Sequence, residues 1–130
     1  MKHPPPPEIL APIVHILTDV YKEVYQTGKK IPKIERYGIY ARVEHAALEC
    51  MTLSVEAALV EPGEKIPVVK RLRIRIDITK RLIRLCQELR VIEDKKYFSL
   101  QEKLVEASKM SHGWLAYLQR KGPPERSPRP

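Results

Sequence analysis

The residues best suited to chemistry in this chain are cations, and they gather in one segment. Nine lysines and arginines lie between residues 65 and 90 of the 130-residue sequence, where only Asp77 and Glu88 carry negative charge. The whole chain has 24 Lys and Arg against 16 Asp and Glu, a net charge of +8. Ammonium and guanidinium groups bind phosphate oxygens, and arginine does so bidentately. The segment therefore predicts binding of a polyanion.

A helical wheel places five of these cations on one polar arc. The five are Lys70, Arg73, Lys80, Arg81 and Arg84. The alternative is an ordinary solvated helix face, in which Asp77 pairs with Arg73 and Arg81 one turn away. We favour polyanion binding, because two acidic residues cannot neutralise nine cations. A basic helix lying on a membrane is a competitor, but its apolar face is needed to build the fold, so no membrane partner is expected.

Signals of catalysis, cofactor binding and metal binding are missing from the sequence. The patterns GxSxG, HExxH, CxxC and Glu-x-x-His do not occur, and no GxG is present to form a phosphate loop. His45 and Glu49, one helical turn apart, are half of a metal site without a second pair to complete four ligands. His15 and His112 have no evident nucleophile or orienting partner. We therefore predict no enzymatic activity, no cofactor and no metal.

The two cysteines, Cys50 and Cys86, lie within apolar patterns. This usage is typical of reduced, buried thiols in an intracellular protein. The longest uncharged stretch, Ile9 to Thr18, is too short to span a bilayer, and no signal-peptide pattern is present. We therefore expect a cytoplasmic protein.

Four segments carry apolar residues at the three- and four-residue spacing of a helix. They span about residues 8–27, 32–60, 67–91 and 95–121. Pro32 can open the second of them, because the first residue of a helix needs no N–H donor. Short connections between helices of this length predict an all-α, antiparallel up-down-up-down four-helix bundle over residues 8–121. A proline-rich lead (1–7) precedes this bundle, and a basic, proline-rich tail (122–130) follows it.

The third segment is ambiguous between strand and helix. From residue 71 to 78, apolar residues alternate with charged ones, which is the period of a strand. We predict a helix, because a single strand in an otherwise helical chain has no partner. Its apolar arc is then so wide that Ile74, Ile78 and Leu85 form a second stripe beside the core stripe. Since exposed apolar patches usually mark interfaces, we expect this second stripe to contact another subunit.

Aromatic residues are expected to pack rather than to bind. Trp114 near the end of the last helix is typical of a packing anchor. Gly113 before it is unfavourable in a helix interior, so we expect a neighbour to pack closely against it. Four tyrosines can in principle stack on bases, but their helical spacing favours the edge of the core, and we assign them no binding role. These are Tyr21, Tyr25, Tyr37 and Tyr40.

Short motifs in a fixed order resemble one protein family. The motifs are Ile31-Pro32-Lys33 with Arg36-Tyr37, then Glu56-Ala57-Ala58, Arg84-Leu85 leading to Leu89, Tyr97, and Gly113-Trp114-Leu115. Together they resemble the accessory variability determinant proteins of diversity-generating retroelements, and their relatives, the bacterial four-helix bundle proteins first noted in ribosomal RNA intervening sequences. The resemblance covers nearly all of residues 8–121. His112 stands where the family usually has the first glycine of Gly-Gly-Trp, and Lys80 where it often has arginine.

The resemblance implies a four-helix bundle assembled as a ring-shaped homopentamer with a basic surface. It implies a non-enzymatic role in mutagenic retrohoming, with RNA, DNA and the element's reverse transcriptase as partners. The basic pair of the family's third helix corresponds to Lys80 and Arg84. Sequence preference should be slight, because phosphate contacts carry no sequence information. The alternative is a structural or interaction bundle of the intervening-sequence type, whose basic face meets ribosomal RNA or solvent.

Overall fold

The computed structural model describes residues 6–121 and contains helices and turns but no strand within that range. The helices are α1 (Pro6–Gly28), α2 (Lys33–Arg36), α3 (Ile39–Leu59), α4 (Lys65–Glu88) and α5 (Asp94–Lys121), with a 3-10 turn η1 (Pro62–Glu64) before α4. The tail expected at residues 122–130 lies outside the described residues, as does most of the lead expected at residues 1–7.

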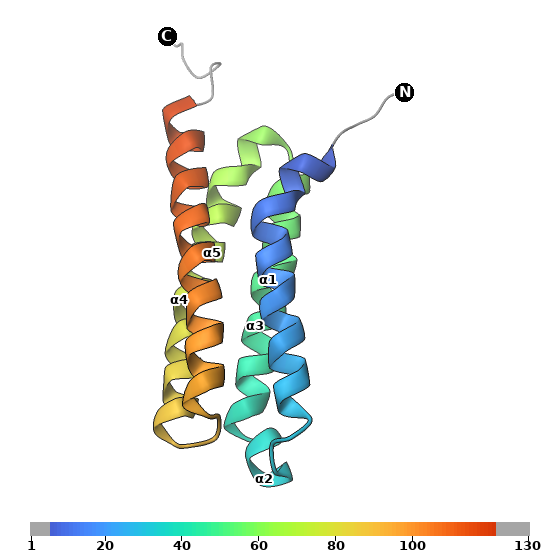
Figure 1. Cartoon of the computed structure of the whole chain (residues 1–130). Coiled ribbons are helices and arrows are strands. Elements are labelled where there is room, and N and C mark those ends of the chain that lie inside the picture. Colours follow the sequence, from blue (N-terminus) through green and yellow to red (C-terminus); the bar gives the residue numbers. More distant parts are fainter. Residues whose placement is uncertain (1–5, 122–130) are drawn as a thin grey trace.

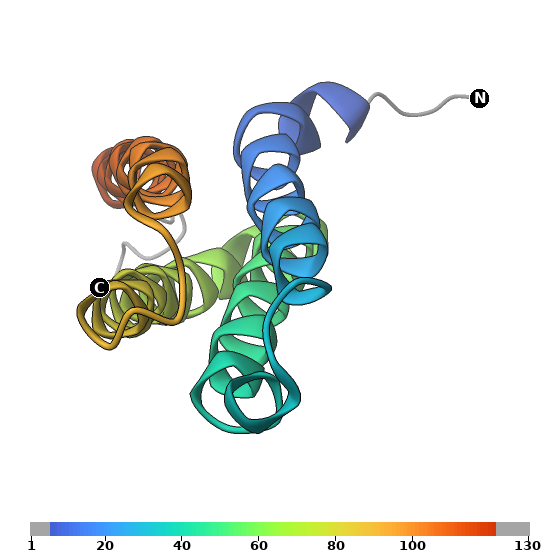
Figure 2. The ribbon, with the colours of Figure 1, turned by 60° about the horizontal axis from the view of Figure 1, so that its bottom comes forward.

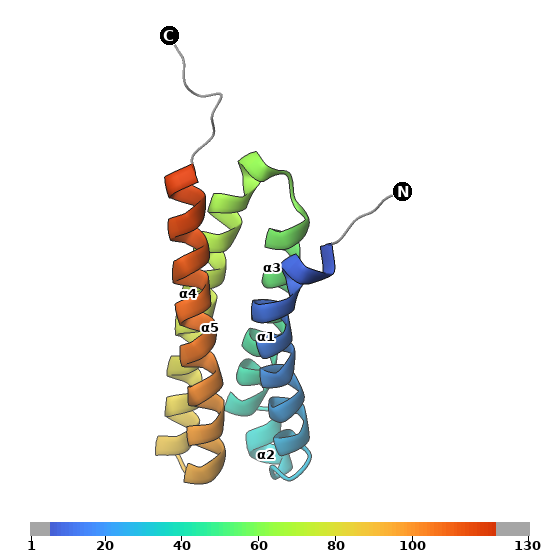
Figure 3. The ribbon, with the colours of Figure 1, turned by 45° about the horizontal axis from the view of Figure 1, so that its top comes forward.

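The four long helices pack side by side and alternate in direction (Figures 1 and 3). Helix α3 packs against α1 and α4, and α5 packs against α4 and α1, so that each long helix has two neighbours. Figure 2 shows the same four helices from one end, with α2 beside the turn that joins α1 to α3. The prediction of four long helices packed together is confirmed.

One expected helix is divided. We expected a continuous helix over residues 32–60, but the chain forms α2, a turn at Tyr37 and Gly38, and then α3. Gly38 has φ −103° and ψ −115°, far from helical values. Tyr37 is consequently 75% exposed, whereas Tyr40, the second residue of α3, is 1% exposed. The expectation that Tyr37 packs at the edge of the core is therefore wrong.

Helix α4 runs without a break through the alternating segment, so the helical prediction for residues 71–78 is correct. It begins two residues earlier than expected, and Pro67 lies in its first turn, where no intrahelical N–H bond is lost. Leu72 and Ile76 are fully buried, while Ile74 between them is 58% exposed. The alternating apolar residues therefore belong to two apolar faces of one helix.

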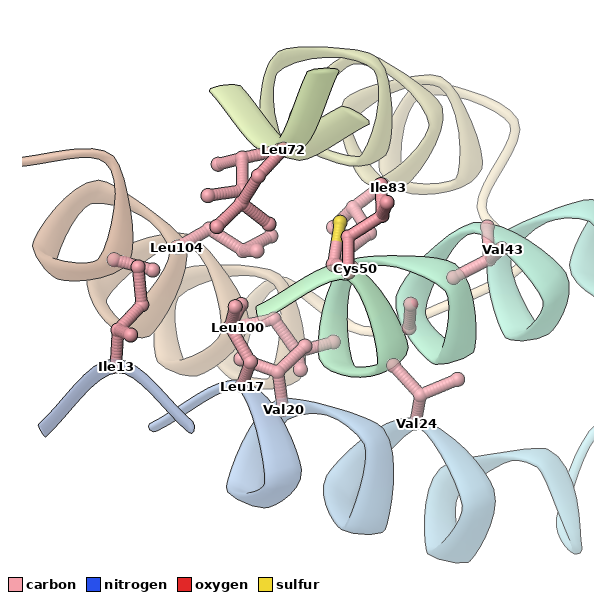
Figure 4. Close-up of a cluster of buried hydrophobic side chains, with 14 of the residues drawn as sticks. Ile13, Leu17, Val20, Val24, Val43, Cys50, Leu72, Ile83, Leu100 and Leu104 are labelled. Carbon is pink, nitrogen blue, oxygen red and sulfur yellow. The ribbon is translucent and has the colours of Figure 1, made fainter. Parts of the chain in front are cut away.

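The core consists of aliphatic side chains from all four long helices, which converge between them in Figure 4. Its labelled members are Ile13, Leu17, Val20 and Val24 of α1, Val43 and Cys50 of α3, Leu72 and Ile83 of α4, and Leu100 and Leu104 of α5. Most of them have no exposed surface. Burial of this kind contributes about 25 cal/mol per Å² of apolar surface, and it is the main term that holds the helices together.

Gly28 and Gly113 have different surroundings. A Cβ built on Gly28 would lie 2.9 Å from Tyr40 Cε2 and 2.9 Å from Glu44 Oε2, so α1 and α3 approach too closely here for a larger residue. At Gly113 nothing lies within 4 Å of such a Cβ. The expectation of a closely packed neighbour at Gly113 is therefore wrong within one chain, although Trp114 does pack against the core.

This contrast predicts opposite effects of the same substitution. Gly28→Ala should lower the free energy of unfolding by about 1–3 kcal/mol, because buried Tyr40 cannot move aside. Gly113→Ala should raise it by about 0.5–1 kcal/mol, because alanine is the better helix former and has open space. Urea unfolding followed by circular dichroism measures both. A destabilising Gly113→Ala would contradict the single-chain packing and indicate a neighbour from another subunit.

Candidate nucleic-acid interface

The five predicted cations all lie on α4, between its α5 side and solvent. Lys70, Arg81 and Arg84 are exposed, and Arg73 and Lys80 are half-buried. Arg73 Nη2 lies 3.2 Å from His112 Nε2 of α5, and the side-chain amide of Gln101 of α5 donates to the carbonyl oxygen of Lys80 at 2.9 Å. These contacts fix how α4 is rotated against α5. The structure therefore brings the predicted cations together on one side of one helix.

The opposite side of α4, toward α3, carries cations that are neutralised across helices. Arg71 Nη2 lies 3.7 Å from Glu56 Oε2, and Arg75 Nε lies 3.3 Å from Glu49 Oε2. Both acids belong to α3. Arginines alternate along the sequence from residue 71 to 75, but neighbouring ones point to different helices. Only the α5 side leaves cations in excess.

On the α5 side, the ion pairs are local and exposed. Lys80 Nζ lies 3.8 Å from Asp77 Oδ1, and Arg84 Nε lies 3.2 Å from Glu88 Oε2. The alternative in which Asp77 pairs with Arg73 and Arg81 is not observed. Exposed pairs within one helix contribute only about 0.3–0.5 kcal/mol. A phosphate can therefore replace these carboxylates at little energetic cost.

The remaining three cations have no carboxylate at all within 4.0 Å in the part of the chain that the structure describes. These are Lys70, Arg73 and Arg81. Arg73 donates to an imidazole nitrogen, and its Nε is buried without a hydrogen-bond partner. Because a guanidinium has five donors and no acceptor, the contact with His112 uses only one of them, but the buried Nε is not a donor that an anion can reach. His112, for which no role was predicted, thus positions one of the candidate residues.

An apolar stripe lies on the solvent side of the same helix. Ile74, Ile78 and Leu85 are 58%, 39% and 38% exposed. They are the residues predicted to contact another subunit, and one chain leaves them uncovered as expected. The subunit contact itself stays a prediction.

The residues that the family resemblance singled out lie at the two ends of the bundle. Pro32 immediately precedes α2, and Arg36 is its last residue. Trp114 lies in the last third of α5 and is half-buried. None of them contacts the cations of α4 in the hydrogen bonds and ion pairs of the side chains of residues 12–121. They therefore lie apart from this face, and their structural role stays a prediction.

Metal binding and thiol chemistry find no support in the described side chains. No group of three or more potential metal ligands occurs among the side chains of residues 12–121, and His45 is exposed on α3. Cys50 Sγ lies 3.3 Å from Thr79 Oγ1, and both thiols are fully buried. Burial raises the pKa of Cys50 to about 11 and that of Cys86 to about 11. The thiolate that a nucleophile requires is therefore scarce near neutral pH.

Comparison of this chain with protein-family models, with curated proteins and with solved structures finds no match. Within residues 6–121, every helix is too short or too polar to cross a bilayer.

The burial of both thiols makes a direct prediction. Cys50 and Cys86 should react with a disulfide reagent such as dithiobis(nitrobenzoate) only when the protein unfolds, because both sulfurs are shielded and their pKa values are raised. The measurement is the absorbance of released thiolate in native buffer and in guanidinium chloride. Rapid reaction of either thiol in native buffer would contradict its burial.

Proposed function

We propose that this protein is a non-enzymatic, nucleic-acid-binding accessory protein of a diversity-generating retroelement. It binds template RNA or cDNA and the element's reverse transcriptase in the cytoplasm, and it supports mutagenic retrohoming. The observation that carries the proposal is the excess of cations on the α5 side of α4. There Lys70, Arg73 and Arg81 have no carboxylate within 4.0 Å among the described residues.

The chemistry of this face supports a polyanion over a small ligand. Its cations follow one helix from Lys70 to Arg84, which at 1.5 Å per residue is about 21 Å. Phosphates in a nucleic-acid backbone recur over such a distance, and no enclosed pocket is needed to bind them. An acidic surface of the reverse transcriptase can use the same cations, because carboxylate and phosphate both match the guanidinium.

Self-association is part of the proposal. The exposed stripe of Ile74, Ile78 and Leu85 lies beside the cations, so burying it against another subunit would place basic faces of neighbouring subunits close together. A ring-shaped homopentamer, as the resemblance implies, would present five such faces to one strand. Several modest contacts then act as one stronger contact through a raised effective concentration.

A charge-matched pair of variants tests the basic face. Lys80→Ala with Arg84→Ala should weaken binding to RNA and DNA and lower the slope of log affinity against log salt by about 1–2, because each lost phosphate contact removes about 0.9 from it. Arg71→Ala with Arg75→Ala removes the same charge from the α3 side and should keep the native slope. Fluorescence anisotropy over a salt series gives both slopes, and circular dichroism checks the fold.

Two results would contradict the proposal in different ways. Equal losses in both variants would mean that only net charge matters and that the α5 side is not a binding face. No binding by the native protein would overturn nucleic-acid binding altogether and favour a structural bundle of the intervening-sequence type.

Light scattering tests self-association. The native protein should have a mass several times the 15.1 kDa of one chain. Ile78→Glu should lower that mass toward one chain, because a buried, unpaired carboxylate opposes association. Leu48→Glu is the matched control, since Leu48 and Ile78 are both 39% exposed, and it should keep the native mass. A native mass of one chain at micromolar concentration would contradict the interface.

A further inference from the structure

The connection between α1 and α3 forms a second cationic surface, which we call the basic tip (residues 29–37). It lies at the end of the bundle where α2 is labelled (Figures 1 and 3). It carries four cations, namely Lys29, Lys30, Lys33 and Arg36. It also carries Ile34 and Tyr37, which at 81% and 75% exposure are the two most exposed large hydrophobic side chains among those described. Apolar side chains this exposed among cations need an explanation.

The charge of the basic tip is not neutralised locally. None of its four cations has a carboxylate within 4.0 Å among the side chains of residues 12–121. Lys29 Nζ lies 5.1 Å from the ring centroid of Tyr25, a contact that leaves its charge in place. Glu35, the one acid of the tip, is half-buried and forms no ion pair with these cations. The tip therefore keeps a net positive charge.

The backbone of the basic tip is held in one conformation. Arg36 N donates to Pro32 O at 2.8 Å, and Tyr37 N donates to Lys33 O at 2.9 Å. Ile31 is 8% exposed and belongs to the core, which anchors the start of the tip. The ring of Tyr37 is thus presented by an ordered turn, so little conformational entropy is lost when it meets a ligand.

We propose that the basic tip binds single-stranded nucleic acid, with Tyr37 stacked on an unpaired base and Lys33 and Arg36 on the adjacent phosphates. An exposed aromatic ring flanked by cations is the unit from which single-strand binding surfaces are built. Bases inside a duplex already stack on each other and cannot offer a face to the ring. The inference deepens the proposed function: the cations of α4 bind phosphates of any strand, and the tip adds a preference for unpaired ones.

A membrane is the competing partner for such a surface. Ile34 and Tyr37 are its only exposed large hydrophobic side chains, and membrane affinity rises with the apolar area that is buried. Two side chains offer little such area, whereas one ring with two neighbouring cations suffices for one nucleotide. The observations therefore favour the nucleic acid, and vesicles enter the test as a separate arm.

The test compares a labelled oligouridylate with a labelled duplex of the same length by fluorescence anisotropy. Tyr37→Ala should weaken single-strand binding about five- to hundredfold, from the usual range of base–aromatic stacking, and leave duplex binding unchanged. Tyr37→Phe keeps the ring and should bind as the native protein does. Tyr117→Ala is the matched control, because Tyr117 is 49% exposed and has Arg120 and Lys121 within 6 Å of its ring, but belongs to the opposite end of the bundle.

Each other outcome overturns this inference in a recognisable way. Equal weakening on single strand and duplex would exclude stacking. Tyr37→Ala could bind single strands as the native protein does while the Lys80 and Arg84 variant binds more weakly. This result would overturn single-strand binding by the basic tip and would leave the proposed function unaffected. The native protein could sediment with vesicles of anionic phospholipid while Tyr37→Ala does not, with oligonucleotide binding the same in both. This result would identify the basic tip as a membrane-binding surface. No binding of any oligonucleotide by the native protein would instead overturn the proposed function.

Discussion

The rotation of α4 about its own axis is the constraint on which the surface of this protein depends. Leu72, Ile76 and Ile83 are fully buried and fix that rotation through the core. Once they point inward, every other side chain of α4 has a determined direction. Cations reach α3 on one side and α5 on the other, and the second apolar stripe faces solvent. A change of even one position in this register would bury charges, which the protein interior does not tolerate without partners.

The bundle closes between α1 and α5 through a polar contact. The side chain of Glu23 is only 12% exposed, and its carboxylate accepts hydrogen bonds from Lys103 Nζ at 2.7 Å and Ser99 Oγ at 3.0 Å. Lys96 Nζ lies 3.9 Å away. A carboxylate this buried is tolerated because its partners satisfy it, and loss of one partner is far more destabilising than the pair is stabilising. This cluster pairs two cations of α5, Lys96 and Lys103, with one carboxylate of α1.

The long helices were predictable from the sequence, but the partners of individual side chains were not. Four helices and the helical state of residues 71–78 follow from periodicity over many residues. The break at Gly38 was not predicted, because Tyr40 and Val43, which follow it, continue the same helical period. The pairing of Arg71 and Arg75 with acids of α3 depends on which helix lies on each side, and periodicity within α4 carries no such information. The prediction of a close neighbour at Gly113 was wrong for the same reason, because tertiary contacts determine the surroundings of this residue.

The distribution of charge explains how a chain of net charge +8 can stay folded and still attract a polyanion. Like charges on one molecule oppose the compact state, and Glu23, Glu49 and Glu56 each pair with a cation of a neighbouring helix. The α5 side of α4 and the basic tip are two surfaces with cations that have no carboxylate within 4.0 Å among the described side chains. These two surfaces lie on different helices of one rigid body. In the proposed function, a strand that contacts one surface would be held at a raised local concentration near the other, so that the two surfaces together would bind more strongly than either alone.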